Sequence, residues 1–557
     1  MNCLAYFGGS ANLLIGADNI MKMIKAASGA ACTGLVSLLL SGASGAAMAQ
    51  TSAAGAPDPR IEQLESEVQQ LAAEVQDLKR GQAEQIVTLA DVEKKTPPTP
   101  AASVSFVGGR PVFASADGKF TATLRGTMQL DVAQYDQASP GPTSVDLRRS
   151  GPALGGTVAN VEAAHARDLK SGDVFRRARL GIDGTAFGDW DYRILLDFAG
   201  AGTENAGQLY ESWVQYSGLK PLRLRIGAFN PSVGLDDQAS TSGTPFLERA
   251  VSSDIARGLA AGDTRTAVQL FANGDHWLVS GAVTGRTIGV INTGAPTGVA
   301  QTYGDQLGLV GRIAGTPLHG EDWLIHFGVH GGYVLRPANT AGPLTTGAES
   351  ATAIAFANTP ELRVDGTKLI NTGNIPARHA DTVGAEFAAQ WRSLLLQAEY
   401  DDFGVQRSDG LSNPDFHGYY VSGSWMVTGE TRKYNSQSAA FDAPPVAHPF
   451  SLTNGGLGAW ELAARYSDMD LNYRPGEAGT YQTGSAIRGG EEQTITAGVN
   501  WYLNSVVRFM ADYQHVKIDR LSPATGPSGA STIWLAPKGA QIGQSYDVFS
   551  VRSQVAF

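Results

Sequence analysis

The sequence predicts an all-β membrane protein, an antiparallel transmembrane β-barrel of about 16 strands preceded by a short N-terminal coiled-coil helix. Three observations predict it: short segments of alternating apolar and polar residues, connections that are either very short or long, and an unusual composition. Charged residues are 17% of the 557 residues, and 67 residues are glycine; soluble domains usually carry roughly 25% charge. Mean hydropathy is only −0.12, which fits strands with one apolar and one wetted face.

Residues 1–49 have the features of a secretory signal peptide, to be removed before residue 50. Lys22 and Lys25 precede a run of small and apolar residues over 26–40, and Ala47-Met48-Ala49 is a small-residue cleavage site. The segment therefore predicts export from the cytoplasm.

The start of the chain and its cysteines follow from this segment. A start at Met21 or Met23 gives the signal peptide its charged beginning. Cys3 and Cys32 are the two cysteines of the chain, and both lie in the removed part. We expect a mature protein without disulfide or thiol chemistry. The net charge of −11 argues against nucleic acid as a partner.

Residues 50–95 are predicted to form a periplasmic coiled-coil segment. Apolar residues recur at intervals of three and four, the seam of a heptad repeat, at Ile61, Leu64, Val68, Leu71, Val75 and Leu78. A helix that packs on its own domain usually has a broader apolar stripe, so the narrow seam favours self-association. Whether two or three helices associate stays open. Residues 96–102 form a proline-rich linker.

Residues 103–557 change to a period of two, which predicts the barrel. The alternation is clearest in residues 191–198, 222–228, 460–466, 495–503 and 507–514. Gly188-Asp189 and Asn504-Ser505 predict tight turns. Residues 138–170, 338–358 and 430–456 are long polar connections. Short turns on one side and long loops on the other are typical of outer-membrane barrels.

The C-terminal segment is an amphipathic strand that ends the chain. Phe549, Val551, Val555 and Phe557 share one face, and polar residues occupy the other. An amphipathic strand with a terminal phenylalanine is a signal for the outer-membrane barrel-assembly machinery. The segment therefore predicts that the chain is assembled into outer-membrane lipid.

Several long blocks are similar to one known family. They read FRRARLGIDGTAFGDWDYRILLDFAG over 175–200, LYESWVQYSGLKPLRLRIGAFNPSVGL over 209–235 and TPFLERAVSSDIARGL over 244–259. With later blocks from Tyr419, Trp460 and Thr494, the chain resembles the phosphate-selective porins O and P. The resemblance implies a homotrimer of 16-stranded barrels in the outer membrane of a Gram-negative cell. It implies a water-filled channel for small anions and other small hydrophilic solutes, and no enzyme activity or cofactor.

The resemblance also assigns site residues. The basic residues that it implies along the anion path are Arg125, Arg177, Arg179, Arg223, Arg225 and Arg249. A constriction loop near residues 231–262 carries the acidic residues Asp236, Asp237 and Glu248. Arg176 has the wrong strand parity for the lumen, so we expect it at the rim or beside a β-bulge.

Two departures from the family concern selectivity. Phosphate-selective members have a basic residue where this chain has Asp236-Asp237, and Gly-Arg where it has Gly126-Thr127. An acidic pair in a narrow zone repels a divalent oxyanion. We therefore expect a mild anion preference, and the alternatives are strict phosphate selectivity and a preference for another solute.

Other readings of the sequence remain. The barrel could serve only to anchor the coiled coil as a structural tether, or it could carry a hydrolase site, although no motif links its serines and histidines. His326 and His330 share a strand face but stand about 13 Å apart at roughly 3.3 Å per residue, too far for one metal. We expect no metal site.

Overall fold

The computed structural model describes residues 66, 70–71, 73–81, 102–137, 169–199, 207–260, 264–288, 306–338, 352–523, 539 and 541–557. The chain divides into two compact units, residues 1–97 and 98–557. In the first unit the described residues are helical, and Leu71, Val75 and Leu78 are exposed. Ile61, Leu64 and Val68 lie outside the described residues. Self-association of this helix stays a prediction.

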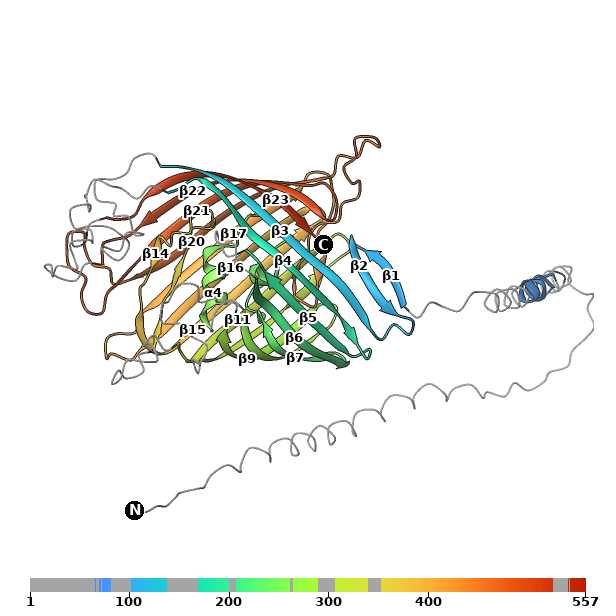
Figure 1. Ribbon diagram of the computed structural model, residues 1–557, viewed down its shortest axis with the longest axis horizontal. Helices are drawn as coiled ribbons and strands as arrows, with labels where there is room; N and C mark the ends of the chain where they lie inside the picture. Colours follow the sequence, from blue (N-terminus) through green and yellow to red (C-terminus); the bar gives the residue numbers. More distant parts are fainter. Residues whose placement is uncertain are drawn as a thin grey trace, which may run out of the picture. The chain divides into compact units, whose positions relative to one another are not determined.

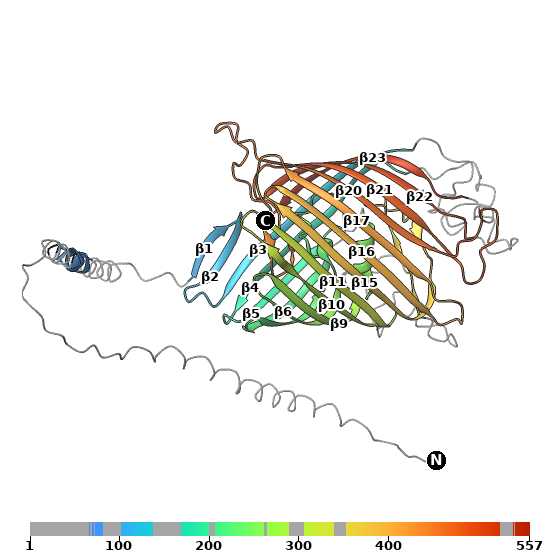
Figure 2. The ribbon, with the colours of Figure 1, turned by 180° about the vertical axis from the view of Figure 1, so that it is seen from behind.

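The second unit is a closed antiparallel barrel (Figures 1 and 2). Its first and last strands pair from Thr127 with Ala556 to Asp136 with Asp547, which closes the ring. The expected 16 strands are confirmed within the described residues. They are β3 (Thr121–Asp136), β4 (Gly172–Ala186), β5 (Trp190–Asp197), β6 (Gln208–Leu219), β7 (Leu222–Phe229), β8 (Arg265–Asn273), β9 (Trp277–Thr287), β10 (Leu307–His319), β11 (Trp323–Arg336), β15 (Ile375–Trp391), β16 (Leu394–Arg407), β17 (Asp415–Met426), β20 (Ala459–Tyr473), β21 (Ile487–Tyr502), β22 (Val507–Asp519) and β23 (Ser545–Ala556).

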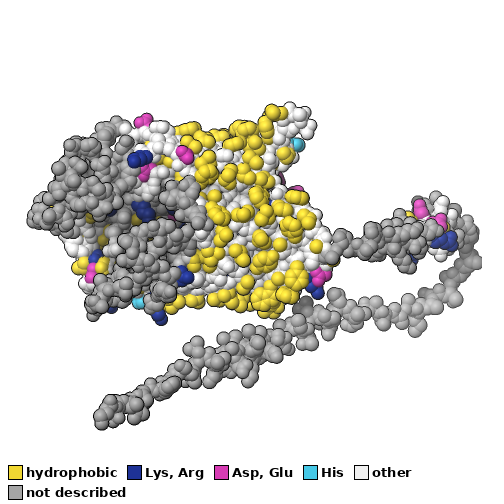
Figure 3. Space-filling model, viewed as in Figure 1, with side chains coloured by type: hydrophobic (Ala, Val, Ile, Leu, Met, Phe, Trp, Pro, Cys, Tyr) yellow, Lys and Arg dark blue, Asp and Glu magenta, His cyan; other side chains and the backbone are white. Residues whose placement is uncertain are grey.

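Strand alternation gives the barrel an apolar outside, which Figure 3 shows as hydrophobic side chains over the outer face. In β20, Trp460 and Leu462 are exposed, whereas Glu461 and Arg465 point inward and are buried. Tryptophans form a girdle beside the short turns, at Trp190, Trp277, Trp323, Trp391, Trp425, Trp460 and Trp501. Indole rings prefer the membrane–water interface, so this girdle marks one edge of the lipid-facing band. Within the described residues, no helix is long and apolar enough to cross a membrane.

The sequence-based expectation for the long connections is wrong for one of them. Residues 427–458 join β17 to β20 on the side of the short turns, where the Met426 amide bonds the carbonyl of Ser393 in the β15–β16 turn. Strand order decides this, because every second connection of an antiparallel ring lies on the same side. Length and polarity in the sequence do not reveal which side that is.

A hairpin of β1 (Ala102–Val107) and β2 (Arg110–Ser115) lies outside the ring, although the sequence placed residues 103–115 in the barrel domain. β2 pairs with the first residues of β3, from Val112 opposite Thr123 to Ala114 opposite Thr121. The hairpin therefore continues the sheet past the turn end of the barrel.

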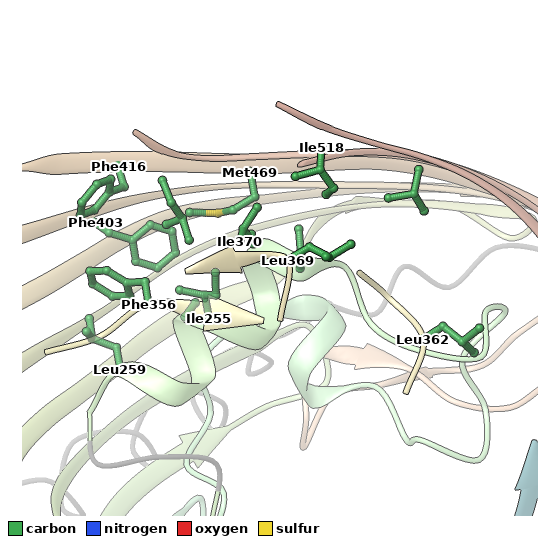
Figure 4. Close-up of a cluster of buried hydrophobic side chains, with 14 of the residues drawn as sticks. Ile255, Leu259, Phe356, Leu362, Leu369, Ile370, Phe403, Phe416, Met469 and Ile518 are labelled. Atoms are coloured by element: carbon green, nitrogen blue, oxygen red, sulfur yellow. The ribbon is translucent and has the colours of Figure 1, made fainter. Parts of the chain in front are cut away.

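Residues 230–260 leave β7, fold into the barrel and contain α3 (Leu235–Gln238) and α4 (Val251–Leu259). We call them the constriction segment, after the constriction loop that the sequence predicts near residues 231–262. Ile255 and Leu259 of α4 pack on Phe356, Phe403 and other buried apolar residues (Figure 4). Phe356 belongs to the β11–β15 connection, which also contains β12 (Ala353–Ile354), β13 (Ala357–Asn358) and β14 (Ile370–Asn371). An apolar core thus fills part of the lumen and fixes the segment.

Close approach of β4 and β5 requires glycine at position 181. A Cβ there would lie 2.3 Å from the Ile194 carbonyl oxygen, whereas a Cβ on Gly281 would meet no atom within 4 Å. We expect Gly181→Ala to lower the free energy of unfolding by about 1–3 kcal/mol, the usual effect of overpacking. Gly281→Ala is the control. Urea unfolding in lipid vesicles measures both, and equal stability of the two variants would contradict the packing.

Candidate functional site in the barrel lumen

Glu248 ties the constriction segment to the barrel wall. Its carboxylate accepts hydrogen bonds from Arg176 at 2.6 and 2.9 Å and from Arg552 at 2.9 Å. Arg177 adds an ion pair at 3.7 Å. All four side chains are largely withdrawn from water. A buried carboxylate needs such partners, because an unpaired charge in the interior is costly.

A β-bulge brings both arginines of β4 to the inside. The β3–β4 register shifts between Gln129, which faces Arg177, and Leu130, which faces Phe175. Arg176 is the extra residue, and a bulge lets consecutive side chains share one face. Of the two positions expected for Arg176, the rim or a β-bulge, the structure shows the bulge. Arg177 is buried and donates to Gln129 at 2.6 Å.

Further hydrogen bonds fix the segment along its length. The Glu399 carboxylate of β16 accepts the amide hydrogens of Leu235 and Asp236 at 2.6 and 2.9 Å. Asp512 of β22 accepts the Leu247 amide hydrogen at 2.9 Å, and Arg465 of β20 donates to the Glu248 carbonyl at 3.0 Å. Anchors on several strands make the segment part of the wall.

The other predicted residues of the segment bond within it. The Arg249 guanidinium donates to the carbonyls of Asp236, Asp237 and Ala239 at 2.9–3.0 Å. Asp237 is buried against Asn230 and Arg257, and Asp236 accepts the Ala250 amide hydrogen. Both acidic side chains are thus held inside the segment's own hydrogen-bond network.

Asp254 of α4 joins the constriction segment to the β11–β15 connection. Its carboxylate lies 2.8 Å from Arg363 and 3.5 Å from Arg257. Burial alone would raise the pKa of Asp254, but the charges of Arg363 and Arg257 outweigh it and hold the pKa at about 2. The contact therefore keeps its charge throughout the ordinary pH range.

The histidine pair belongs to a buried ion-pair cluster. Glu386 stands between His326 and His330 and bonds them at 3.1 and 2.9 Å. Atoms of His330, Glu386 and Glu399 lie close enough to offer ligands to one metal ion. Glu386, however, already gives both oxygens to Arg312 at 2.8 and 2.7 Å. A fixed guanidinium repels a metal cation, so the geometry fits a structural cluster better.

The long connection on the turn side also enters the barrel. Its Arg432 pairs with Glu461 at 2.7 Å and donates to the Gly243 carbonyl at 2.7 Å. Arg312 donates to the carbonyls of Ser438 and Ala439 at 2.6 and 2.8 Å. These residues flank β18 (Tyr434–Asn435) and β19 (Ala440–Phe441). The connection thus packs under the constriction segment and fills the lumen beside β10 and β20.

Strands β3 to β6 retain water-exposed charges on their inner faces. Arg125 lies 3.4 Å from Asp183, and the two side chains are 32% and 26% exposed, respectively. Arg193 pairs with Glu211 at 3.0 Å and is 25% exposed. Arg223 and Arg225 of β7 are partly exposed as well, and we call the inner faces of β3 to β7 the wetted wall. It contains Arg125, Arg179, Arg223 and Arg225 of the predicted lining.

Aromatic rings support the arginines of the wetted wall. The Arg179 guanidinium lies 3.6 Å from the Tyr210 ring centroid and 2.8 Å from Asp197. Arg193 and Arg225 lie 5.2 and 4.3 Å from the Trp213 ring. Cation–π contacts of this kind fix the guanidinium without neutralising it. Alternation over residues 191–198 puts Arg193 on the polar strand face, yet neither Arg193 nor Trp213 is among the residues that the sequence predicts for the lining.

Two arginines of the wetted wall have neutral hydrogen-bond partners. Arg225 donates to the Gln215 amide oxygen at 3.0 and 2.8 Å, and Arg223 donates to the Asn273 amide oxygen at 2.7 Å. Arg125, Arg179 and Arg193 instead face carboxylates. Among these five arginines, the two with neutral hydrogen-bond partners are therefore those of β7.

The C-terminal residues close the ring on its outer side. Phe549 and Val551 are exposed, and Val555 pairs with Met128 of β3. The Phe557 amide donates to the Gly126 carbonyl at 2.9 Å. A Cβ at Gly126 would lie 2.4 Å from the Phe557 ring, so the absence of a side chain there makes room for the terminal ring.

A closed barrel with an apolar outer band, an inward-folded segment and a charged, wetted wall defines an outer-membrane porin channel. The family described as "Phosphate-selective porin O and P" matches residues 156–547. Because the match covers more than half of the sequence, the chain belongs to this family. Family and fold point to a channel rather than an enzyme.

Individual relatives are distant. Porin O of Pseudomonas aeruginosa is 24% identical over 426 residues, 74% of this chain and 86% of that protein. An uncharacterized protein of Caulobacter vibrioides is 24% identical over 494 residues, 86% and 90% of the two chains. Among solved structures, the anion-selective porin from Comamonas acidovorans aligns with a TM-score of 0.41 and 12% identity over 79% of this chain and 100% of that one. The DcaP channel of Acinetobacter baumannii aligns with a TM-score of 0.40 and 10% identity over 80% and 99%.

Replacement of Glu248 tests the anchor of the constriction segment. Glu248→Gln removes the charge shared by Arg176, Arg177 and Arg552. Loss of one partner of a buried ion pair costs about 3–5 kcal/mol. We expect the segment to loosen, which single-channel recording detects as larger current fluctuations and a lower voltage for closure. Glu321→Gln, in an exposed turn, is the control. If current fluctuations and closing voltage in Glu248→Gln equal those of the wild type, Glu248 does not anchor the segment.

Proposed function

We propose that this porin conducts small anions and other small hydrophilic solutes with a weak preference for anions. The observation that carries the proposal is the pair Arg223 and Arg225, whose hydrogen-bond partners on the wetted wall are neutral amides. A fixed guanidinium beside the permeation path lowers the energy of a passing anion and raises that of a cation.

Strict phosphate selectivity is the alternative. Phosphate binds best to two or more guanidiniums that have donors to spare. Arg125, Arg179 and Arg193 share their donors with carboxylates at 3.4, 2.8 and 3.0 Å. Arg223 and Arg225, which donate to neutral amides, are therefore the guanidiniums that a phosphate would contact. The carboxylates of Asp236 and Asp237, which the sequence suggested would repel an oxyanion, accept hydrogen bonds from their own segment instead.

We further propose the finer features that the sequence predicts. Residues 1–49 are removed on export, residues 50–95 form a coiled coil in the periplasm, and the barrel forms a homotrimer. The strand that contains Phe549, Val551, Val555 and Phe557 is the signal for the barrel-assembly machinery. The competing role as a mere tether for the coiled coil predicts no ion conduction, so single-channel conductance of the purified protein separates the two roles.

Charge reversal on β7 tests the anion path. In Arg225→Glu, the energy of an anion at roughly 6 Å should rise by about 1–6 kcal/mol, because the charge changes by two units at an effective dielectric between protein surface and water. We expect the reversal potential in a salt gradient to shift toward that of a cation-selective channel. The shift should correspond to at least a several-fold fall in the anion-to-cation permeability ratio. Arg392→Glu, in an exposed turn, is the matched control. An unchanged potential in Arg225→Glu would exclude Arg225 from the lining.

Competition between ions tests the selectivity. In a planar bilayer with chloride as the main anion, we expect phosphate to reduce the current only at millimolar concentrations. Block at micromolar phosphate would establish the alternative, a phosphate-selective channel. A wild-type reversal potential on the cation side would contradict the proposed anion preference.

A further inference from the structure

The β1–β2 hairpin has one apolar face that no described part of the chain covers. Val104 pairs with Phe113 across the hairpin, and Phe106 pairs with Pro111. The side chains of Val104, Phe106 and Phe113 are 60%, 76% and 50% exposed. Ser103 and Ser105 alternate with them on the opposite face, together with Val107, which is 62% exposed; the two phenylalanines lie on the first face. Exposed phenylalanines gathered on one face usually mark a contact surface.

The hairpin is held in a fixed place. Phe557 ends the last strand opposite Gly126, and β2 takes the next positions on β3, with Phe113 opposite Ala122. The hairpin turn also packs beneath the β21–β22 turn, because a Cβ on Gly109 would lie 2.5 Å from a methyl group of Val506. Figures 1 and 2 show both strands beyond the turn end of the barrel. The apolar face therefore lies past the edge of the lipid-facing band.

The tryptophan girdle is interrupted at the same place. Within the described residues, a tryptophan lies beside each turn-side connection of the ring except β6–β7, and none lies in β22, β23, β3 or β4. This sector carries phenylalanines instead, including the ring pair of Phe120 and Phe187 at 4.9 Å. A phenyl ring lacks the N–H that suits the wet membrane interface, so the sector is suited to a drier protein contact.

The helix of the first unit exposes a second apolar stripe on the same chain. Leu71, Val75 and Leu78 are exposed and follow the heptad spacing of a self-associating helix. The helix precedes the hairpin by about twenty residues. Copies of the chain that associate through the helix bring their hairpins close together, because the intervening segment is short.

We propose that the apolar face of the β1–β2 hairpin is a contact surface between copies of this chain, beneath the seam of β23 and β3. The inference rests on the homo-oligomer of the proposed function and assigns a surface to it. Phe106 and Phe113 are its central residues. Each copy supplies the same face, as in other symmetric assemblies.

The test compares how a charge on each face of the hairpin changes the stability of the oligomer. The double variant Phe106→Asp, Phe113→Asp places charges on the apolar face, and Ser105→Asp places one on the opposite, exposed face. We expect the double variant to dissociate in detergent at a protein concentration at least tenfold higher than the control. Sedimentation measures the oligomer, and the heat-dependent gel shift of the intact barrel confirms folding.

A photoreactive group at position 106 of the otherwise unchanged protein identifies the molecule that contacts the apolar face. Cross-links between copies are expected, and cross-links to lipid alone would overturn the proposal. An oligomer as stable in the double variant as in the control would also overturn it. Single-channel conductance is measured in parallel, and we expect it to be unchanged in each pore. Absence of conductance in the wild-type protein would instead refute the channel function. Failure of the channel function can therefore be distinguished from failure of the proposed contact surface.

Discussion

The constraint on which the structure depends is the absence of water in the hydrocarbon core of a membrane. Each backbone N–H and C=O in lipid needs a partner within the protein. Here the partner of the last strand is the first, and ten residue pairs join β23 to β3. Closure of the ring leaves no lipid-exposed edge. The period-two sequence follows from it, because one face of each strand then meets lipid and the other meets the lumen.

Closure places many charged side chains inside one ring, and they separate into two groups. Arg312, Arg432 and Arg552 are buried in pairs with Glu386, Glu461 and Asp131 at 2.6–2.7 Å. Such pairs fix the inward-folded segments to the wall, and a fully paired charge does little to attract a permeating ion. Arg193, Arg223 and Arg225 keep contact with water or have neutral partners. The same residue type therefore stiffens one side of the lumen and, on the other, keeps contact with water or with neutral partners.

Much of the barrel could be predicted from the sequence, because strand faces depend on local alternation. The strands at 191–198, 460–466 and 495–503, the tight turns and the closing C-terminal strand are confirmed. The environment of the side chains in the lumen could not be predicted from the sequence in the same way. Whether an inward arginine is wet or buried depends on segments distant in the chain, as with Glu248 and Arg552, which are 304 positions apart. Parity also failed to reveal the hairpin of β1 and β2, whose alternation resembles that of a barrel strand.

The most direct test of the account uses adjacent residues on opposite faces of β5. Arg193 faces the lumen and Ile194 is exposed on the outside, and no cysteine follows Cys32 in the sequence. In Arg193→Cys a water-soluble, charged thiol reagent should change the single-channel current within seconds. In Ile194→Cys the same reagent should leave the current unchanged, because lipid covers the thiol. A response at position 194 with none at position 193 would contradict a lipid-facing outside and a wetted inside.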